Sequence, residues 1–272
     1  MLILRLVSEG KIDLDSRINQ FFPKLPDWSK KISVENLLNH TSGLPDYEEV
    51  LNKMSFPRRN EPTNDMVVKI LTRKKKLGFE PGFVQQYSES GYVLLTILAE
   101  RSTGKKYNDL LKEIIINPLK MTDTFLCDRY SIGSVNMAVG YKPRITKYQE
   151  FDYNPLNFIV GNEGIYSTAP DLAKWGASWF SNNILPKCLV NKAFAPAKLA
   201  NGQLTDRGYS FSIGTFRGEK IIYHGGSWVG FRLMMVLIPK RKLSGFLLSN
   251  TIEYNNESKR ILPIIDLLSK YL

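Results

Sequence analysis

The chain has 272 residues, 43% hydrophobic and 23% charged, the balance of a globular protein long enough to bury a sizeable core. Its formal net charge of +11 comes from scattered lysines and arginines, with short runs at residues 73–76 and 240–242 and no aromatic stacking platform, so we expect no nucleic-acid partner. Two distant cysteines and two histidines without an H-E-x-x-H motif predict neither a disulfide framework nor a metal site.

The chain starts with apolar residues at helical spacing, and Gly10 lies where such a helix would end. The apolar stretch, residues 1–7, is too short for a signal-peptide core and contains Arg5, and no stretch is long enough to span a membrane. No capping residue precedes this helix, so its leading N–H groups lack partners. We therefore expect the sequence to begin inside a helix.

Capping residues and helical periodicity predict further helices along the first two thirds of the chain. Ser33, Thr63, Ser88 and Thr168 are the expected caps. The predicted helices cover residues 34–38, 64–75, 89–103, 107–116 and 169–180. Between the last two, the irregular stretch of residues 126–167 is long enough to indicate that it lines something.

After Gly202 the apolar period changes from helical to alternating, which is typical of strands joined by short turns. The predicted strands cover residues 209–216, 220–224, 231–238 and 245–249, and an amphipathic helix over residues 261–268 follows. The sequence thus predicts an α+β protein. We expect a mainly helical lobe over residues 1–202 and an antiparallel sheet with its helix over residues 203–272.

Two glycines, Gly225 and Gly226, follow His224 at the end of the second predicted strand. Because glycine has no Cβ, we expect a bend here in which a ligand approaches the backbone and N–H groups converge on a developing negative charge. The alternative is an ordinary hairpin turn with a surface imidazole.

Tyr87 lies at the junction between an extended segment and a predicted helix. The helix dipole at this position is expected to favour the phenolate, which suits a general base. The alternative is a tyrosine that fills space beneath a loop.

Five strings resemble, in order, the signatures of the class C β-lactamase-related serine hydrolases. This superfamily includes class C β-lactamases, penicillin-binding DD-peptidases, D-aminopeptidases and related esterases. The resemblance implies a β-lactamase/transpeptidase-like fold, with an antiparallel sheet flanked by helices, a mostly helical lobe and the site between them. It also implies acyl transfer on a β-lactam, D-amino-acid peptide or ester, without a cofactor. The strings are residues 6–15, 37–44, 87–92, 164–173 and 224–226.

The resemblance also implies roles for single residues. Tyr87 matches the tyrosine of the Y-x-N motif, which assists proton transfer to and from the nucleophile. His224, Gly225 and Gly226 match the K-T-G or H-x-G motif, so the backbone N–H of Ser227 is the expected oxyanion donor. Glu89 stands in place of the asparagine of Y-x-N, and we expect an anion there that only accepts hydrogen bonds.

The nucleophile of this superfamily is the serine of S-x-x-K, at the start of a helix with the lysine one turn later. S-x-x-K strings occur only at residues 8–11 and 102–105, where predicted helices end at glycine, and there is no G-x-S-x-G elbow. We expect neither string to act.

In the superfamily the motif lies just upstream of the segment matched by residues 2–11, on the same helix. We therefore expect the nucleophile, the start of its helix and the preceding strands to be missing, and the chain to be inactive in acyl transfer. A full-length member is expected outside the cytoplasm; the oligomeric state stays open. The alternative is a pseudoenzyme that binds peptidoglycan-like peptides or a protein partner without reacting.

Overall fold

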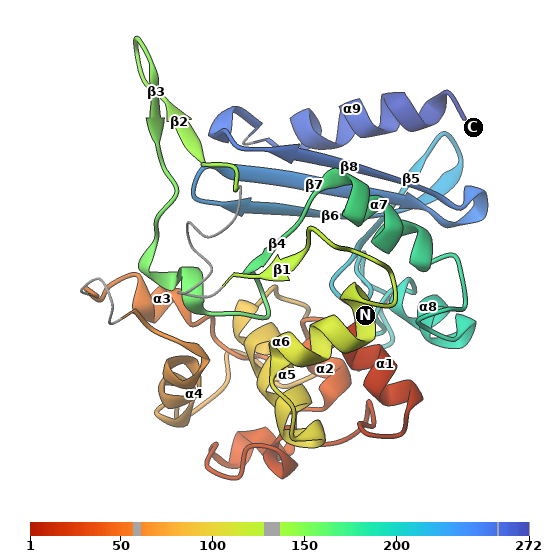
Figure 1. The fold of residues 1–272 in the computed structure, drawn as a ribbon. Coiled ribbons are helices and arrows are strands. Elements are labelled where there is room, and N and C mark those ends of the chain that lie inside the picture. The colour runs from red at the N-terminus through yellow and green to blue at the C-terminus, as the bar shows by residue number, and fades with distance from the viewer. Residues whose placement is uncertain (57–60, 128–136, 255, 272) are drawn as a thin grey trace.

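The computed structural model describes residues 1–56, 61–127, 137–254 and 256–271 (Figure 1). Part of the predicted irregular stretch, residues 128–136, lies outside the described residues. A four-stranded antiparallel sheet and a group of helices face each other, and α9 covers the opposite side of the sheet (Figure 1). These features confirm the predicted α+β architecture.

The sheet has the strand order β5-β6-β7-β8, and every neighbouring pair is antiparallel. Shorter strands form two separate pairs, β1 with β4 and β2 with β3. The strands are β1 Phe125–Leu126, β2 Tyr141–Pro143, β3 Tyr148–Glu150, β4 Ile165–Tyr166, β5 Ser212–Phe216, β6 Glu219–Trp228, β7 Phe231–Ile238 and β8 Leu243–Ser249.

The predicted bend after His224 is wrong, because β6 continues straight through Gly225 and Gly226. The two glycines pair with Met234 and Leu233 of β7. A Cβ on Gly226 would lie 2.8 Å from the Leu233 side chain, so strand packing rather than a turn requires glycine there. The chain reverses only at residues 229–230, between the paired residues at the ends of β6 and β7.

The helices agree with the predicted ones except in their ends, and two short ones, α3 and α8, were not predicted. The Ser33 and Thr168 side chains cap α2 and α7 as expected, whereas Thr63 and Ser88 make no side-chain cap. The α-helices are α1 Leu2–Ser8, α2 Val34–Leu38, α3 Glu48–Leu51, α4 Asn64–Thr72, α5 Glu89–Thr103, α6 Tyr107–Leu111, α7 Ala169–Ser178, α8 Lys187–Ala193 and α9 Glu257–Ser269. One π turn, Lys112–Ile116, extends α6, and 3₁₀ turns cover Ile18–Gln20, Asp27–Lys30, Pro155–Phe158, Pro239–Arg241 and Ile252–Tyr254.

The main core lies between the helices and the inner face of the sheet, and a smaller one lies between the outer face and α9. Helix α5 is central to the main core: Leu94 and Leu98 are fully buried, as its apolar sequence predicts. The boundary between two lobes at residue 202 stays a prediction. Helix α7 lies before residue 202 in the chain, and it packs against β8, which lies after residue 202. Over the described residues, no helix has the length and apolarity to cross a bilayer.

Candidate active site

Tyr87 and His224 face each other across the space between the helices and the sheet. Their ring centroids are 6.5 Å apart. Tyr87 ends the extended segment that enters α5, and His224 lies in the middle of β6. Two side chains that the sequence analysis selected separately therefore belong to one site.

A second histidine, His40, supports Tyr87 from behind. Its ring centroid is 4.4 Å from that of Tyr87 and 5.1 Å from that of Tyr92. The His40 Nδ1 accepts the backbone N–H of Ser88 at 3.3 Å, and its carbonyl accepts that of Gln86 at 2.9 Å. The loop of residues 39–45 thus fixes the segment that carries Tyr87. No sequence pattern predicted a role for His40, although this residue lies within the string of residues 37–44 that carries the resemblance.

Arg207, which the sequence analysis missed, provides the positive charge of the site. Its guanidinium carbon lies 5.9 Å from the centroid of the Tyr87 ring. Burial, followed by the Arg207 charge, lowers the pKa of His224 to about 4. The same two causes, joined by His224, lower the pKa of His40 to about 3. Both imidazoles are therefore neutral at neutral pH.

Arg207→Gln is expected to raise the pKa of His224, because the substitution removes a nearby positive charge. Burial is the larger cause, so the pKa should stay below the ordinary value of about 6.5. NMR titration of the imidazole measures the shift. Arg217→Gln, in the exposed turn between β5 and β6, is the control and should leave the pKa unchanged. A pKa of His224 that is the same in both variants would contradict the electrostatic role of Arg207.

The expectation that the helix dipole favours the phenolate of Tyr87 is wrong in direction. Tyr87 exposes 43% of its surface, but burial of its phenol, followed by the Glu89 charge, raises its pKa above the ordinary value. Arg207 acts in the opposite direction and does not overcome burial. At neutral pH the phenol is protonated and can donate a hydrogen bond to an oxygen across the cleft.

The backbone of β6 is open on one side beyond His224. Trp228 and Phe231 flank the two-residue turn of the β6–β7 hairpin, which is the position of a hydrogen-bonded pair, and such pairs alternate along an antiparallel ladder. The N–H and C=O groups of Gly225 and of Ser227 therefore point away from β7. On that side β5 has already ended, since its last pair joins Ser212 to Tyr223. The N–H of Ser227 is thus free of the ladder, where an oxyanion donor is expected.

Glu89 is not the simple anion that the sequence suggested. Burial, then the Glu48 and Asp46 charges, raise the pKa of Glu89 to about 8. The Asn162 amide donates to Glu89 Oε2 at 2.7 Å and to the Tyr47 hydroxyl at 3.0 Å. The raised pKa favours the protonated form of Glu89, which can donate a hydrogen bond.

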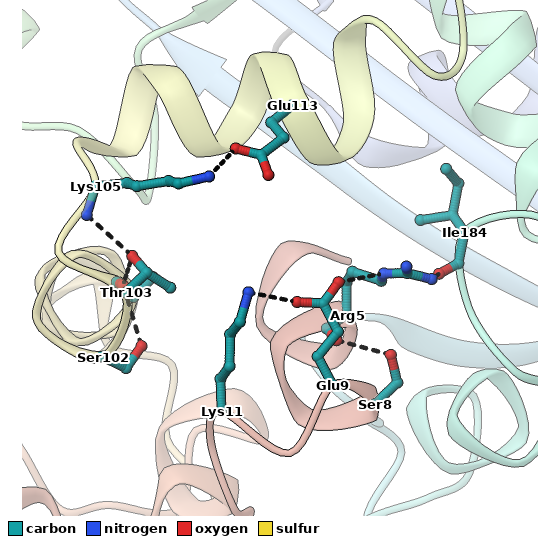
Figure 2. Close-up of polar contacts among 10 residues, drawn as sticks. Arg5, Ser8, Glu9, Lys11, Ser102, Thr103, Lys105, Glu113 and Ile184 are labelled. Carbon is teal, nitrogen blue, oxygen red and sulfur yellow. Dashed lines mark hydrogen bonds and ion pairs between the residues drawn. The ribbon is translucent and has the colours of Figure 1, made fainter.

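Neither S-x-x-K string has the arrangement of a nucleophile beside its base (Figure 2). Ser8 Oγ donates to the Arg5 carbonyl at 2.7 Å, and Lys11 Nζ pairs with Glu9 at 2.8 Å. In the other string, the Ser102 hydroxyl donates to the Ala99 carbonyl of its own helix. The Lys105 ammonium forms an ion pair with Glu113. In both strings the serine and lysine have different partners.

A cavity of about 290 Å³ lies beside His224 and Tyr92, between the helices and the inner face of the sheet. Its walls are mainly apolar and come from α1, α5, α7 and β7. Across the described residues, no cluster of three or more histidine, cysteine or acidic side chains could hold a metal ion. The groups described at this site are a phenol, neutral imidazoles, an arginine, the Glu89 carboxyl group and backbone N–H groups.

The antiparallel sheet, the helical layer and the Tyr87–His224 pair between them define a β-lactamase/transpeptidase-like protein. A sequence model of the family described as "Beta-lactamase" matches residues 1–268, so the chain belongs to the beta-lactamase family.

Characterised proteins and solved structures resemble the chain over nearly its whole length. It is 25% identical to penicillin-binding protein 4* of Bacillus subtilis (strain 168), over 96% of this chain and 60% of that protein. The octameric penicillin-binding protein homologue from Pyrococcus abyssi matches with a TM-score of 0.82 and 24% identity, over 98% of this chain and 63% of that one. D-amino acid amidase from Ochrobactrum anthropi SV3, complexed with L-phenylalanine, matches with a TM-score of 0.80 and 25% identity, over 98% of this chain and 81% of that one.

Proposed function

We propose that this chain carries the proton-handling and oxyanion-binding groups of a serine hydrolase that transfers acyl groups. The observation that carries the proposal is the 6.5 Å approach of Tyr87 to His224, beside the open edge of β6. Tyr87 exchanges a proton with the attacking or leaving group, and the neutral His224 accepts or donates a hydrogen bond at the same reacting centre. The N–H of Ser227 stabilises the oxyanion, which contributes about 3 kcal/mol in other acyl-transfer enzymes.

The substrate class follows from the site and the relatives together. The oxyanion donor requires a carbonyl that becomes tetrahedral, as in an amide, ester or β-lactam. The relatives are named as a penicillin-binding protein and a D-amino acid amidase. A β-lactam, a D-amino-acid peptide or amide, or an ester is therefore the proposed acyl substrate.

The sequence has S-x-x-K strings only at residues 8–11 and 102–105, and in both the serine and the lysine have other partners. Covalent catalysis depends on that hydroxyl, and its removal abolishes the acyl-enzyme even where binding groups remain. We infer that this chain binds the substrate class without forming an acyl-enzyme.

A fluorescent penicillin tests both parts of the proposal. We expect saturable binding measured by fluorescence anisotropy, and no labelled band after denaturing electrophoresis. Tyr87→Phe and His224→Ala should each weaken binding several-fold, since each removes a polar group that faces the ligand. Arg217→Gln, in an exposed turn, should not.

Two results would contradict the proposal. A stoichiometric adduct that survives denaturation would show an active nucleophile, and Ser8→Ala and Ser102→Ala would then show whether either serine carries it. Absence of saturable binding would show that the chain lacks the proposed ligand-binding site.

A pseudoenzyme is the second candidate function, favoured by an intact Tyr87–His224 cleft without a placed nucleophile. Both candidates predict binding without an acyl-enzyme, so competition in the same assay tests which ligand the site prefers. An uncleaved D-alanyl-D-alanine peptide that displaces the penicillin and itself stays intact supports a peptide-binding pseudoenzyme.

A further inference from the structure

Arg260 of α9 reaches through the outer face of the sheet to the strand that borders the site. The residue is only 8% exposed. Its Nη1 donates to the Gly226 carbonyl at 2.8 Å, to Ser227 Oγ at 3.0 Å and to the Leu233 carbonyl at 3.4 Å. A buried guanidinium thus lies directly behind the peptide group that joins Gly226 to Ser227.

No carboxylate of the described residues forms an ion pair with Arg260. Its Nε is buried without a hydrogen-bond partner there. The neighbouring charge is also positive: burial, followed by the Arg260 charge, lowers the pKa of Arg232. Burial of a charge that no opposite charge balances opposes folding, so fold stability alone does not account for this arginine.

The geometry of the peptide group connects Arg260 to the open edge of β6. A trans peptide points its C=O and its N–H in opposite directions. Gly226 pairs with Leu233, so its carbonyl points to β7 and the N–H of Ser227 points to the open side. A hydrogen bond from a cation to the carbonyl polarises the peptide, which makes the N–H at its other end a stronger donor.

We propose that Arg260 is a positioning residue that strengthens the Ser227 N–H as an oxyanion donor. It polarises the Gly226–Ser227 peptide from the far side of the sheet and holds the Ser227 hydroxyl on that side. This inference rests on the proposed role of Ser227 in acyl transfer. The N–H of Gly225 is an internal control, because it shares the open edge while its own peptide carbonyl, that of His224, receives no hydrogen bond from Arg260.

NMR of the ¹³C,¹⁵N-labelled chain tests the polarisation directly. In Arg260→Gln, the Gly226 carbonyl carbon and the Ser227 amide proton should both move upfield, because the cationic donor is lost. The Gly225 amide should move less. Arg260→Lys, which keeps the charge, should restore part of the shift, and thermal melts verify that both variants fold. Equal movement of the Gly225 and Ser227 amides, or no movement of either, would overturn the inference.

A titration with D-phenylalanine as the carboxylate probe separates this inference from the proposed function. In the wild-type chain the Ser227 amide should shift on binding, and Arg260→Gln should raise the dissociation constant several-fold. If the wild-type Ser227 amide does not respond to the probe, the proposed oxyanion site fails even where the Arg260 effect on the peptide is present. If Ser227 responds with equal affinity in Arg260→Gln, only the role of Arg260 fails.

Discussion

Replacement of Gly43 by alanine is expected to lower the free energy of unfolding by roughly 3 kcal/mol or more. The backbone of Gly43 has φ +73°, a conformation that costs other residues about 1–2 kcal/mol. A Cβ would also lie 2.2 Å from the backbone oxygen of Phe79, so the two segments would have to separate. Chemical denaturation of the two chains measures the difference.

The same substitution is expected to displace Tyr87, because the loop of residues 39–45 holds the segment before it. The Gly43 carbonyl accepts the N–H of Gly78 at 2.8 Å, and the His40 carbonyl accepts that of Gln86 at 2.9 Å. Separation of the two segments therefore breaks the support of the phenol, and binding of the fluorescent penicillin should be lost along with stability.

Gly10 provides a matched control for the contact with Phe79. Its φ is +69°, nearly that of Gly43, but a Cβ there would meet no atom within 4 Å. Gly10→Ala should therefore cost only about 1–2 kcal/mol and leave penicillin binding unchanged. Equal losses of stability for the two variants would show that the close approach to Phe79 contributes nothing.

The sequence was sufficient to predict the sheet, the main helices and the Tyr87–His224 pair. The alternating and helical periods report which side of each element is buried, and the resemblance to the serine hydrolase superfamily implies that the phenol and the imidazole share one site. The glycines after His224 show the limit of such reasoning. A glycine is required both in a bend and where a neighbouring side chain approaches a strand, and only the pairing of Gly226 with Leu233 decides between them.

The electrostatics of the site could not be predicted, since they depend on residues that are distant in the sequence. Arg207 and Arg260 belong to no motif, and each makes a contact that exists only in the folded chain. The pKa values of Tyr87 and Glu89 were expected to follow a helix dipole and an isolated carboxylate. Burial raises both, and it depends on the packing of the whole loop and helix around them.

Glu163 is expected to make the protein less stable in alkaline solution. Burial, followed by the Glu89 and Glu48 charges, raises its pKa to about 9. In the unfolded chain a glutamate ionises near pH 4.5, so between these values the folded state retains a proton that the unfolded state has lost. This stabilising contribution is complete below pH 4.5 and is lost as the pH rises through 9.

The histidines have the opposite effect on the pH dependence of stability. The lowered pKa values of His40 and His224 reduce the stability of the folded protein as the pH falls below about 6.5.

Glu163→Gln removes the alkaline part of this dependence, because the amide stays neutral at every pH. The melting temperature of the variant relative to the wild type should rise by roughly 4 °C or more between pH 5 and pH 9. Glu113→Gln, at an exposed position, should follow the wild-type curve over the same range. Differential scanning calorimetry across the pH range measures all three chains. Parallel curves for Glu163→Gln and the wild type would mean that Glu163 is already ionised in the folded protein, and would contradict the raised pKa.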